Sequence, residues 1–413
     1  MSGRIQAPRG TFDVLGEDAS ARTALEETAR TVLERAGYAR IETPVFEATE
    51  LFARGVGEST DVVQKEMYTL EEGDGSITLR PEGTAPVCRA YLEHGMHKQP
   101  QPVKLWYLSS FFRRERPQKG RFRQFWQVGA EAIGSDDPAV DAESILLLAE
   151  LLEALGCRGV RLRIGSLGTP ETRRAYREEL QAHLRAHEAD LAEEVAARID
   201  LNPLRAFDSD HRGTQAVMAR APRLLDRLAD ADREHFEAVR ALLDDVGQGY
   251  EVDPTLVRGL DYYTRTVFEF SSDALGAQSG VGGGGRYDGL MEQIGGPPTP
   301  GIGWASGVER ILLTASTVAP VPPPLDLFVA YEGEARRAGA FRLAADARRA
   351  GYAARLELGG RSLKGQLRQA GNAGARYVAI LRAGETVLRD METGDQQPVE
   401  IDTVMHHIGR VPL

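Results

Sequence analysis

The sequence predicts an α+β protein in which a β-rich first domain carries a helical insertion and is followed by a small α/β domain. Three observations support this. Apolar residues recur at helical spacing over residues 172–199, between segments with strand-like alternation; four prolines fall within residues 314–326; and strand-like runs alternate with helical ones after residue 325. Together they indicate two domains joined by a linker.

The first domain is expected to span residues 1–320. Residues 160–164 alternate apolar and polar side chains, as a half-buried strand does. Over residues 172–199 the apolar positions then recur at fours and a seven, which is helical spacing, and a second helical stretch runs over residues 214–245. We therefore predict a helical insertion over residues 168–250, whose amphipathic helices need no role beyond packing.

The proline-rich segment 314–326 has no strong periodicity and is typical of a semi-rigid linker. After it, residues 325–330 form an apolar, strand-like run, and residues 334–350 form a helical stretch rich in Ala and Arg. Because strands and helices continue to alternate, residues 325–413 are predicted to form an α/β domain with a parallel or mixed sheet.

The composition excludes several classes of protein. The chain has 413 residues, 42% hydrophobic and 27% charged, as ordinary globular proteins do. Its two cysteines, without a CxxC pair or a histidine cluster, argue against a disulfide scaffold or a structural zinc site. With neither a signal peptide nor a long apolar segment, we expect a cytoplasmic protein without a membrane partner. The net charge of −11 decides little, since a local basic patch can still bind a polyanion.

Residues 111–127 are unusually basic. Six Lys or Arg residues stand between positions 113 and 123 against one acid, Glu115, and aromatic residues flank them. Pro117 and Gly120 interrupt the run, which predicts two strands joined by a basic loop. A guanidinium group pairs with phosphate through two hydrogen bonds, and an aromatic ring can stack on a base. The segment indicates a nucleotide-phosphate site facing nucleic acid, although a solvated surface hairpin would have a similar composition.

Two acidic segments point to a site for an ammonium group or another hydrogen-bond donor. Glu82 and Thr84 lie two residues apart at the end of a predicted strand. Gln127 and Glu131 have period-two spacing, so together with Gly129 they share one face of a strand. A carboxylate on an inward face requires a partner, because burying an unpaired charge is costly.

Three further segments carry residues that structure alone does not require. Residues 256–264 place an arginine and a tyrosine pair directly before an apolar strand, and the glycines of residues 282–289 would let backbone approach a ligand closely. Residues 301–310 read as strand, turn and helix, with Arg310 on the helix. Each could be an ordinary turn, and no GxxxxGK[ST] phosphate loop is present. Their combination favours a ligand site.

The order of these motifs resembles the histidyl-tRNA synthetase family, which belongs to the class II aminoacyl-tRNA synthetases, over almost the full chain. Pro44 in ARIETPVFE resembles the motif 1 proline at the dimer interface, residues 112–115 resemble motif 2, and residues 303–310 resemble motif 3. Those three motifs are shared by many class II enzymes.

Other segments resemble this family more specifically. LVRGLDYYT and GGGRYDGL resemble its two histidine-recognition signatures, and residues 361–366 with the segments beyond them are similar to its anticodon-binding domain. The resemblance implies a six-stranded antiparallel catalytic sheet flanked by helices, with a helical insertion, followed by a mixed α/β anticodon-binding domain at residues 325–413.

The resemblance also implies an activity. The protein would activate L-histidine with ATP to histidyl-adenylate and transfer the histidyl group to the 3′ end of tRNA(His), acting as a homodimer. The apolar region 41–70 adds weak support for the dimer. Mg²⁺ would accompany ATP, with ligands that the sequence does not assign and no metal cluster of the protein's own. DNA and membranes are not expected partners.

By the same resemblance, Arg113 and Arg258 are the catalytic residues that contact the α-phosphate. Glu131 and Tyr263 would meet the two imidazole nitrogens. The residues expected to bind ATP are Arg113, Glu115, Arg121, Phe125 and Arg310. Those expected to bind histidine are Glu82, Thr84, Gln127, Glu131, Arg258, Tyr262, Tyr263 and Tyr287.

Two alternatives stay open at this point. One is a catalytically inactive synthetase-like paralogue that serves as a regulatory subunit or tRNA sensor; the presence of Arg258, Tyr263 and Arg310 and of the second domain favours the enzyme. The other is a synthetase for proline or threonine, which Glu131 and LVRGLDYYT disfavour. The chain departs from the family's usual wording at Arg114, where His is common, at Trp304, where Phe is usual, and in its all-glycine run at 282–285.

Overall fold

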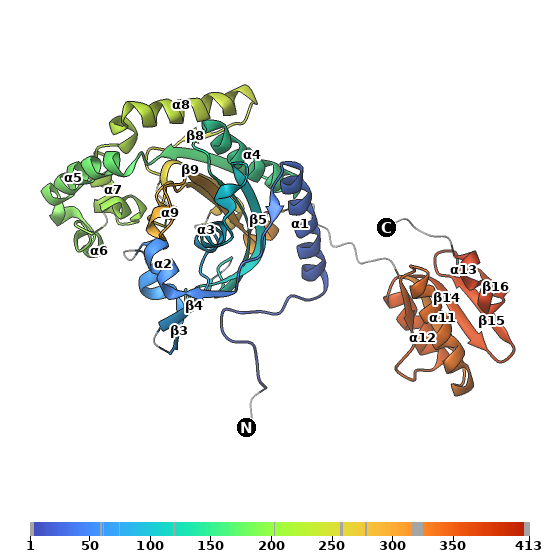
Figure 1. The fold of residues 1–413 in the computed structure, drawn as a ribbon. Coiled ribbons are helices and arrows are strands. Elements are labelled where there is room, and N and C mark those ends of the chain that lie inside the picture. The colour runs from blue at the N-terminus through green and yellow to red at the C-terminus, as the bar shows by residue number, and fades with distance from the viewer. Residues whose placement is uncertain are drawn as a thin grey trace. The chain divides into compact units, whose positions relative to one another are not determined.

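The computed structural model describes residues 4–408 except 58–59, 61, 74, 119, 202, 257–258, 277–278 and 316–324. The chain divides into two compact units, Met1–Ala319 and Pro320–Leu413 (Figure 1). Within the described ranges, no helix is long and apolar enough to cross a membrane, and no group of three or more His, Cys, Asp or Glu side chains could hold a metal ion. Cys88 and Cys157 are both free thiols.

The first unit is built on an eight-stranded sheet in the order β1-β5-β6-β11-β10-β9-β7-β8. The six inner strands are antiparallel throughout, which confirms the predicted sheet. A two-residue strand adds in parallel at each edge. The strands are β1 (Ala39–Arg40), β5 (Val103–Phe112), β6 (Gln124–Ile133), β7 (Val160–Ser166), β8 (Glu251–Val252), β9 (Thr264–Ser272), β10 (Gly280–Arg286) and β11 (Gly301–Gly307).

Helices cover both faces of this sheet. One face packs against α1 (Gly16–Arg35), α4 (Pro138–Ala154), α8 (Asp230–Asp245) and α10 (Val308–Thr314) in a single hydrophobic cluster. The other face packs against a second cluster that includes α3 (Thr84–Glu93), α5 (Pro170–Ala186) and α9 (Leu290–Gln293), as Figure 1 shows for α3 and α9. A small sheet of β2 (Phe46–Ala48), β4 (Gly75–Leu79) and β3 (Tyr68–Glu72) lies beside α2 (Thr49–Val56).

The helical region differs in detail from the two long helices that periodicity predicts. The first stretch divides into α5, a 3-10 turn and α6 (Glu193–Ala196). At the end of α5, the ring nitrogen of His187 lies 2.9 Å from the carbonyl oxygen of His183. The second divides into α7 (Arg212–Met218), a 3-10 turn and α8. Pro222 lies in that break, and proline interrupts a helix because it has no N–H and restricts the preceding residue.

The second unit has a five-stranded sheet in the order β13-β12-β14-β15-β16, parallel across its first three strands and antiparallel across the rest. Alternate residues of β12 pack toward α11 and toward α12 in two separate clusters, so a helix covers each face. Its elements are β12 (Leu325–Tyr331), α11 (Arg337–Arg349), β13 (Ala354–Leu356), α12 (Leu363–Asn372), β14 (Ala375–Arg382), β15 (Glu385–Asp390), β16 (Gln396–Val399) and α13 (Val404–His407).

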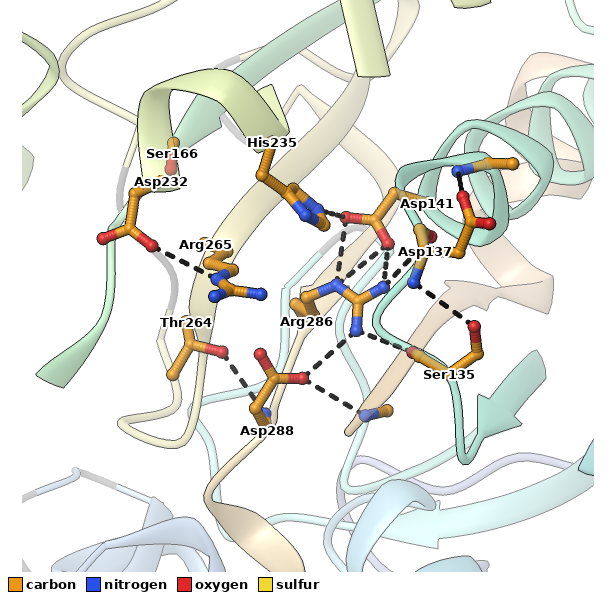
Figure 2. Close-up of polar contacts among 12 residues, drawn as sticks. Ser135, Asp137, Asp141, Ser166, Asp232, His235, Thr264, Arg265, Arg286 and Asp288 are labelled. Carbon is orange, nitrogen blue, oxygen red and sulfur yellow. Dashed lines mark hydrogen bonds and ion pairs between the residues drawn. The ribbon is translucent and has the colours of Figure 1, made fainter. Parts of the chain in front are cut away.

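A buried ion pair joins three elements of the first unit (Figure 2). Asp141 on α4 and Arg286 at the end of β10 are both 0% exposed, and Arg286 Nε donates to Asp141 at 2.9 Å. His235 on α8 donates to the other carboxylate oxygen at 2.8 Å. Burial disfavours the charged carboxylate, yet the bond from His235 and the charge of Arg286 outweigh it and hold the pKa of Asp141 below its ordinary value.

Asp141→Ala is expected to destabilise the first unit by about 3 kcal/mol, because it removes the buried partner of the Arg286 guanidinium and leaves only the longer pair with Asp288. Urea unfolding followed by tryptophan fluorescence measures this unit alone, since Trp106, Trp126 and Trp304 all lie in it. Arg30→Ala, which breaks two exposed ion pairs on α1 with Glu27 and Glu34, is the control and should leave the unfolding midpoint unchanged. Equal midpoints for the two variants would contradict the structural role of the buried pair.

Candidate active site

A cavity of about 460 Å³ opens in the first unit where β5, β6, β10 and β11 meet the start of α3 and the segment before β9. Arg258 lies outside the described residues, and Glu131 and Tyr287 do not line the cavity. Ten of the residues singled out from the sequence do line it: Glu82, Thr84, Arg113, Glu115, Arg121, Phe125, Gln127, Tyr262, Tyr263 and Arg310.

Glu131 lies directly behind the closed end of the cavity and is 0% exposed. One carboxyl oxygen accepts from the Thr84 hydroxyl at 2.9 Å and faces the Tyr107 hydroxyl at 3.4 Å, and the other accepts from the Tyr287 hydroxyl at 2.8 Å. Thr84 and Tyr107 line the cavity. The carboxyl group is therefore one side chain away from anything bound there.

The neighbouring strands leave room for this carboxyl group. Gly303 on β11 pairs with Glu131 on β6, and a Cβ atom at Gly303 would lie 1.7 Å from a carboxyl oxygen of Glu131. Gly129, two residues earlier on the same face of β6, is opposite Tyr107 on β5, and a Cβ atom there would lie 2.4 Å from the Tyr107 hydroxyl. The sequence analysis missed Tyr107; the pairing of Gly129 with an aromatic residue across a hairpin is the signal that could have found it.

Burial changes the titration of both acids at this end. It raises the pKa of Glu131 to about 8, although hydrogen bonds from Tyr287 and Thr84 act in the opposite direction. Burial also raises the pKa of Glu82 above its ordinary value. Glu82 accepts the backbone N–H groups of Thr84 at 2.8 Å and Ala85 at 2.9 Å, where α3 begins. The closed end thus presents hydroxyl and carboxyl groups and no cation among the described residues that line it.

The opposite end holds three arginines. Arg113 donates through Nε to the backbone oxygen of Pro81 at 2.9 Å, and its guanidinium carbon lies 5.4 Å from the centre of the Phe125 ring. Arg121 pairs with Glu115 at 3.3 Å. Arg310 donates to the backbone oxygens of Gly120 and Gly280. Burial, followed by the charge of Arg121, lowers the pKa of Arg310. Glu115, Glu269 and Glu309 also line the cavity, so this end offers guanidinium donors for a polyanion alongside carboxylates that balance their charge.

The glycine-rich run is a central strand and not a loop. Residues 280–286 form β10 between β9 and β11, and a Cβ atom at Gly284 would lie 2.0 Å from the backbone oxygen of Gly303. Close strand packing therefore requires glycine there, while residues 280–283 line the cavity. Likewise, β11 continues into α10 with no intervening turn.

Glu309 is a second residue that the sequence analysis missed. It lines the cavity and is held by Arg22 of α1 at 2.6 Å and by the backbone N–H of Trp126 at 3.2 Å. It falls within the 303–310 segment that resembles motif 3, but the sequence assigns it no role, because its partners come from residues almost 300 and 200 positions away.

Comparisons with known proteins identify the family of this chain. Residues 10–311 match the family model described as histidyl-tRNA synthetase. The histidine–tRNA ligase of Desulforamulus reducens is 48% identical over 403 residues, covering 95% of this chain and 96% of the relative. This chain belongs to the histidyl-tRNA synthetase family. The histidine–tRNA ligase of Streptomyces avermitilis is 47% identical, with 97% of each chain covered.

Solved structures share the fold of this chain. The apo histidyl-tRNA synthetase of S. aureus superimposes with a TM-score of 0.81 at 35% identity, covering 98% of this chain and 100% of that one. A Bacillus halodurans C protein described as an ATP phosphoribosyltransferase regulatory subunit/histidyl-tRNA synthetase has a TM-score of 0.65 at 21% identity and covers 93% of this chain. At that identity the second likeness shows the fold alone.

The stability of the first unit should depend on pH through Glu131. Its folded-state pKa of about 8 lies above the ordinary value of 4.5, so between these values the folded protein binds the proton more tightly than the unfolded chain. Stability contributed by the neutral carboxyl group is therefore complete below pH 4.5 and is lost as the pH rises through 8, by roughly 3–5 kcal/mol.

Glu131→Gln keeps the shape of the side chain and removes this titration. Tryptophan-monitored unfolding of both proteins from pH 5 to 8.5 should show the wild type losing stability relative to the variant as the pH rises. A constant difference between the two curves would contradict the raised pKa.

Proposed function

We propose that the protein is a histidine–tRNA ligase that activates L-histidine with ATP and transfers the histidyl group to the 3′ end of tRNA(His). One observation supports this proposal: in a member of the histidyl-tRNA synthetase family, a single cavity has buried carboxyl groups at or behind one end, with Glu131 among them, and arginines at the other. The first end suits an imidazole and an ammonium group, and the second suits a triphosphate.

Histidine would occupy the closed end. Its ammonium group would lie against Glu82, Thr84 and Gln127, all of which line the cavity. The imidazole has a nitrogen on each of two edges, and Glu131 and the Tyr263 hydroxyl are the partners proposed for them. Since Thr84 and Tyr107 stand between Glu131 and the cavity, Glu131 would meet its nitrogen only after these side chains shift. Tyr287 keeps Glu131 oriented through the 2.8 Å bond, and Tyr262, whose hydroxyl is 3.3 Å from Glu82, orients that carboxyl group. Buried partners of this kind reject amino acids that cannot satisfy them.

ATP would occupy the other end. In the first step an oxygen of the histidine carboxylate attacks the α-phosphorus, the bond to the bridging oxygen breaks, and pyrophosphate leaves. Arg113, together with Arg258, is proposed to stabilise the charge on the α-phosphate; Arg121 and Arg310 would hold the remaining phosphates, and Phe125 would stack on adenine with Glu115 beside it. Fixed donors aimed at developing charge are effective because they need no reorganisation during the reaction.

Mg²⁺ is proposed to arrive with ATP. Carboxylate oxygen is the ligand type that Mg²⁺ prefers, and Glu115 and Glu269 both line the cavity, so the residues present fit the ion. When bound, the ion would neutralise phosphate charge.

In the second step a ribose hydroxyl of the tRNA 3′ adenosine attacks the acyl carbon, and AMP leaves with its phosphate. An oxygen of that phosphate could accept the hydroxyl proton. The unit Pro320–Leu413 is the proposed anticodon-binding domain, on the similarity of residues 361–366 to the family.

A homodimer in the cytoplasm is the proposed working form. Pro44 carries the resemblance to the interface motif, and in the small sheet that follows it the apolar side chains of Phe46 and Leu70 are 54% and 58% exposed in the isolated chain. A second copy would remove this apolar surface from water.

Purified protein should catalyse ATP–pyrophosphate exchange that depends on histidine and is absent with the other amino acids. Arg113→Ala should lower kcat by on the order of 10²–10³, because one preorganised donor to the α-phosphate is lost. No exchange from correctly folded wild-type protein would refute the proposal and favour a regulatory paralogue or tRNA sensor.

Gly303→Ala should weaken histidine binding more than tenfold, since its Cβ atom would displace the Glu131 carboxyl group. Gly289→Ala is the matched control from the glycine-rich signature: its Cβ atom meets nothing closer than 4.0 Å, so binding should be unchanged. Titration calorimetry with histidine measures both. Equal affinities in the two variants would exclude Glu131 as the residue that recognises the side chain.

A further inference from the structure

Arg265 has an unusual backbone. Among the described residues other than glycine, it is the one with a positive φ, +43°, a conformation that costs free energy for any residue with a Cβ atom. It follows Tyr262, Tyr263 and Thr264 directly, and the pairing of β9 with β10 shifts register at this point. Such a bulge redirects side chains, and strained residues of this kind cluster at functional sites.

Three contacts hold Arg265 in this conformation. Its backbone N–H donates to the oxygen of Gly168 at 2.9 Å, and its own oxygen accepts from the N–H of Leu167 at 2.7 Å. Its side chain donates through Nε to Asp232 at 3.2 Å, as Figure 2 shows. The bulge is therefore tied to the segment that enters the helical region and, through Asp232, to α8, the last helix of that region.

Asp232 is itself firmly held. It is 1% exposed, and its second carboxylate oxygen accepts from the Thr169 backbone N–H at 2.9 Å and the Thr172 hydroxyl at 3.0 Å. A buried carboxylate with three donors is a rigid anchor, because each bond would be lost to an apolar environment if it moved.

The residues just before Arg265 shape the closed end of the cavity. Tyr262 and Tyr263 line it, and the ring of Tyr262 lies 6.0 Å from that of Tyr287, centre to centre. The Thr264 hydroxyl accepts from the backbone N–H of Asp288, the residue after Tyr287 (Figure 2). A change in the Arg265 backbone would therefore be transmitted to all three tyrosines.

We infer that Asp232 and Arg265 are positioning residues for the amino-acid pocket: their partly buried ion pair holds the strained backbone of Arg265, and this backbone directs Tyr262 and Tyr263 into the cavity. Neither residue lines the cavity or touches the substrate. The inference rests on the proposed function, since it names what keeps the histidine site in shape.

The test compares Arg265→Ala with Arg265→Gly. Both variants lose the side-chain anchor and leave Asp232 without its arginine partner to the same extent, but only glycine adopts a positive φ without strain. In histidine-dependent ATP–pyrophosphate exchange, Arg265→Ala and Asp232→Asn should raise the KM for histidine about tenfold, with the KM for ATP unchanged and kcat altered less than threefold. Arg265→Gly should stay within about threefold of wild type.

His235→Gln is the matched control. It lies one turn along α8 from Asp232, is also buried, and loses a contact to Asp141, which is separated from the bulge by Arg286 and Asp288. It should lower the unfolding midpoint and leave the KM for histidine unchanged. If His235→Gln raises that KM as much as Asp232→Asn, or if Arg265→Ala and Arg265→Gly are equal, the inference is wrong.

Hydrogen exchange measured by mass spectrometry separates this outcome from failure of the proposed function. Asp232→Asn and Arg265→Ala should speed amide exchange over residues 260–267 relative to wild type and His235→Gln, whether or not the wild type shows exchange activity with histidine. Unchanged protection in that segment would refute the positioning role by itself.

Discussion

Burial of the Glu131 carboxyl group is the constraint on which the rest of the site depends. A carboxyl group enclosed in a sheet needs donors for both oxygens and space between strands that are normally in contact. Thr84 and Tyr287 supply the donors from outside the strand pair, and Gly303 supplies the space. The enclosure also raises the pKa of the carboxyl group to about 8, since burial disfavours its charged form.

The same burial explains why the two ends of the cavity differ. An arginine or lysine side chain against Glu131 would ionise it and compete with the imidazole for it. The arginines lie instead at the more exposed end, where Arg121 and Arg113 are partly solvated and share Glu115. Phosphates bound there would replace water and Glu115 as partners of these guanidinium groups. One cavity can therefore bind a weakly basic ring and a triphosphate without either site disturbing the other.

The sequence predicts those site residues whose role can be inferred from residues close to them in the chain. The alternation of Gln127 and Glu131 places both on one strand face, and Glu82 and Thr84 stand together where a strand gives way to a helix. The sequence analysis missed Tyr107 and Glu309 because their places depend on strand register and on contacts with distant segments. The two long helices predicted for the insertion are each broken in the structure. Pro222 and the turn at His187 interrupt them, although the apolar periodicity of the sequence continues past both points. Arg258 lies outside the described residues, so its role rests on the family motif.

Two buried acids on neighbouring helices each pair with an arginine that is next to a tyrosine of the pocket. Arg286 precedes Tyr287 and is paired with Asp141, while Arg265 follows Tyr263 and is paired with Asp232. Apolar side chains would bury these strand ends at a lower desolvation cost. Apolar side chains could not fix the direction of the backbone, because hydrophobic contacts are non-directional, whereas hydrogen bonds are directional. A pocket that recognises a planar ring by the position of hydroxyl groups requires a fixed backbone direction. This requirement accounts for the ion pair beside each of the two tyrosine segments.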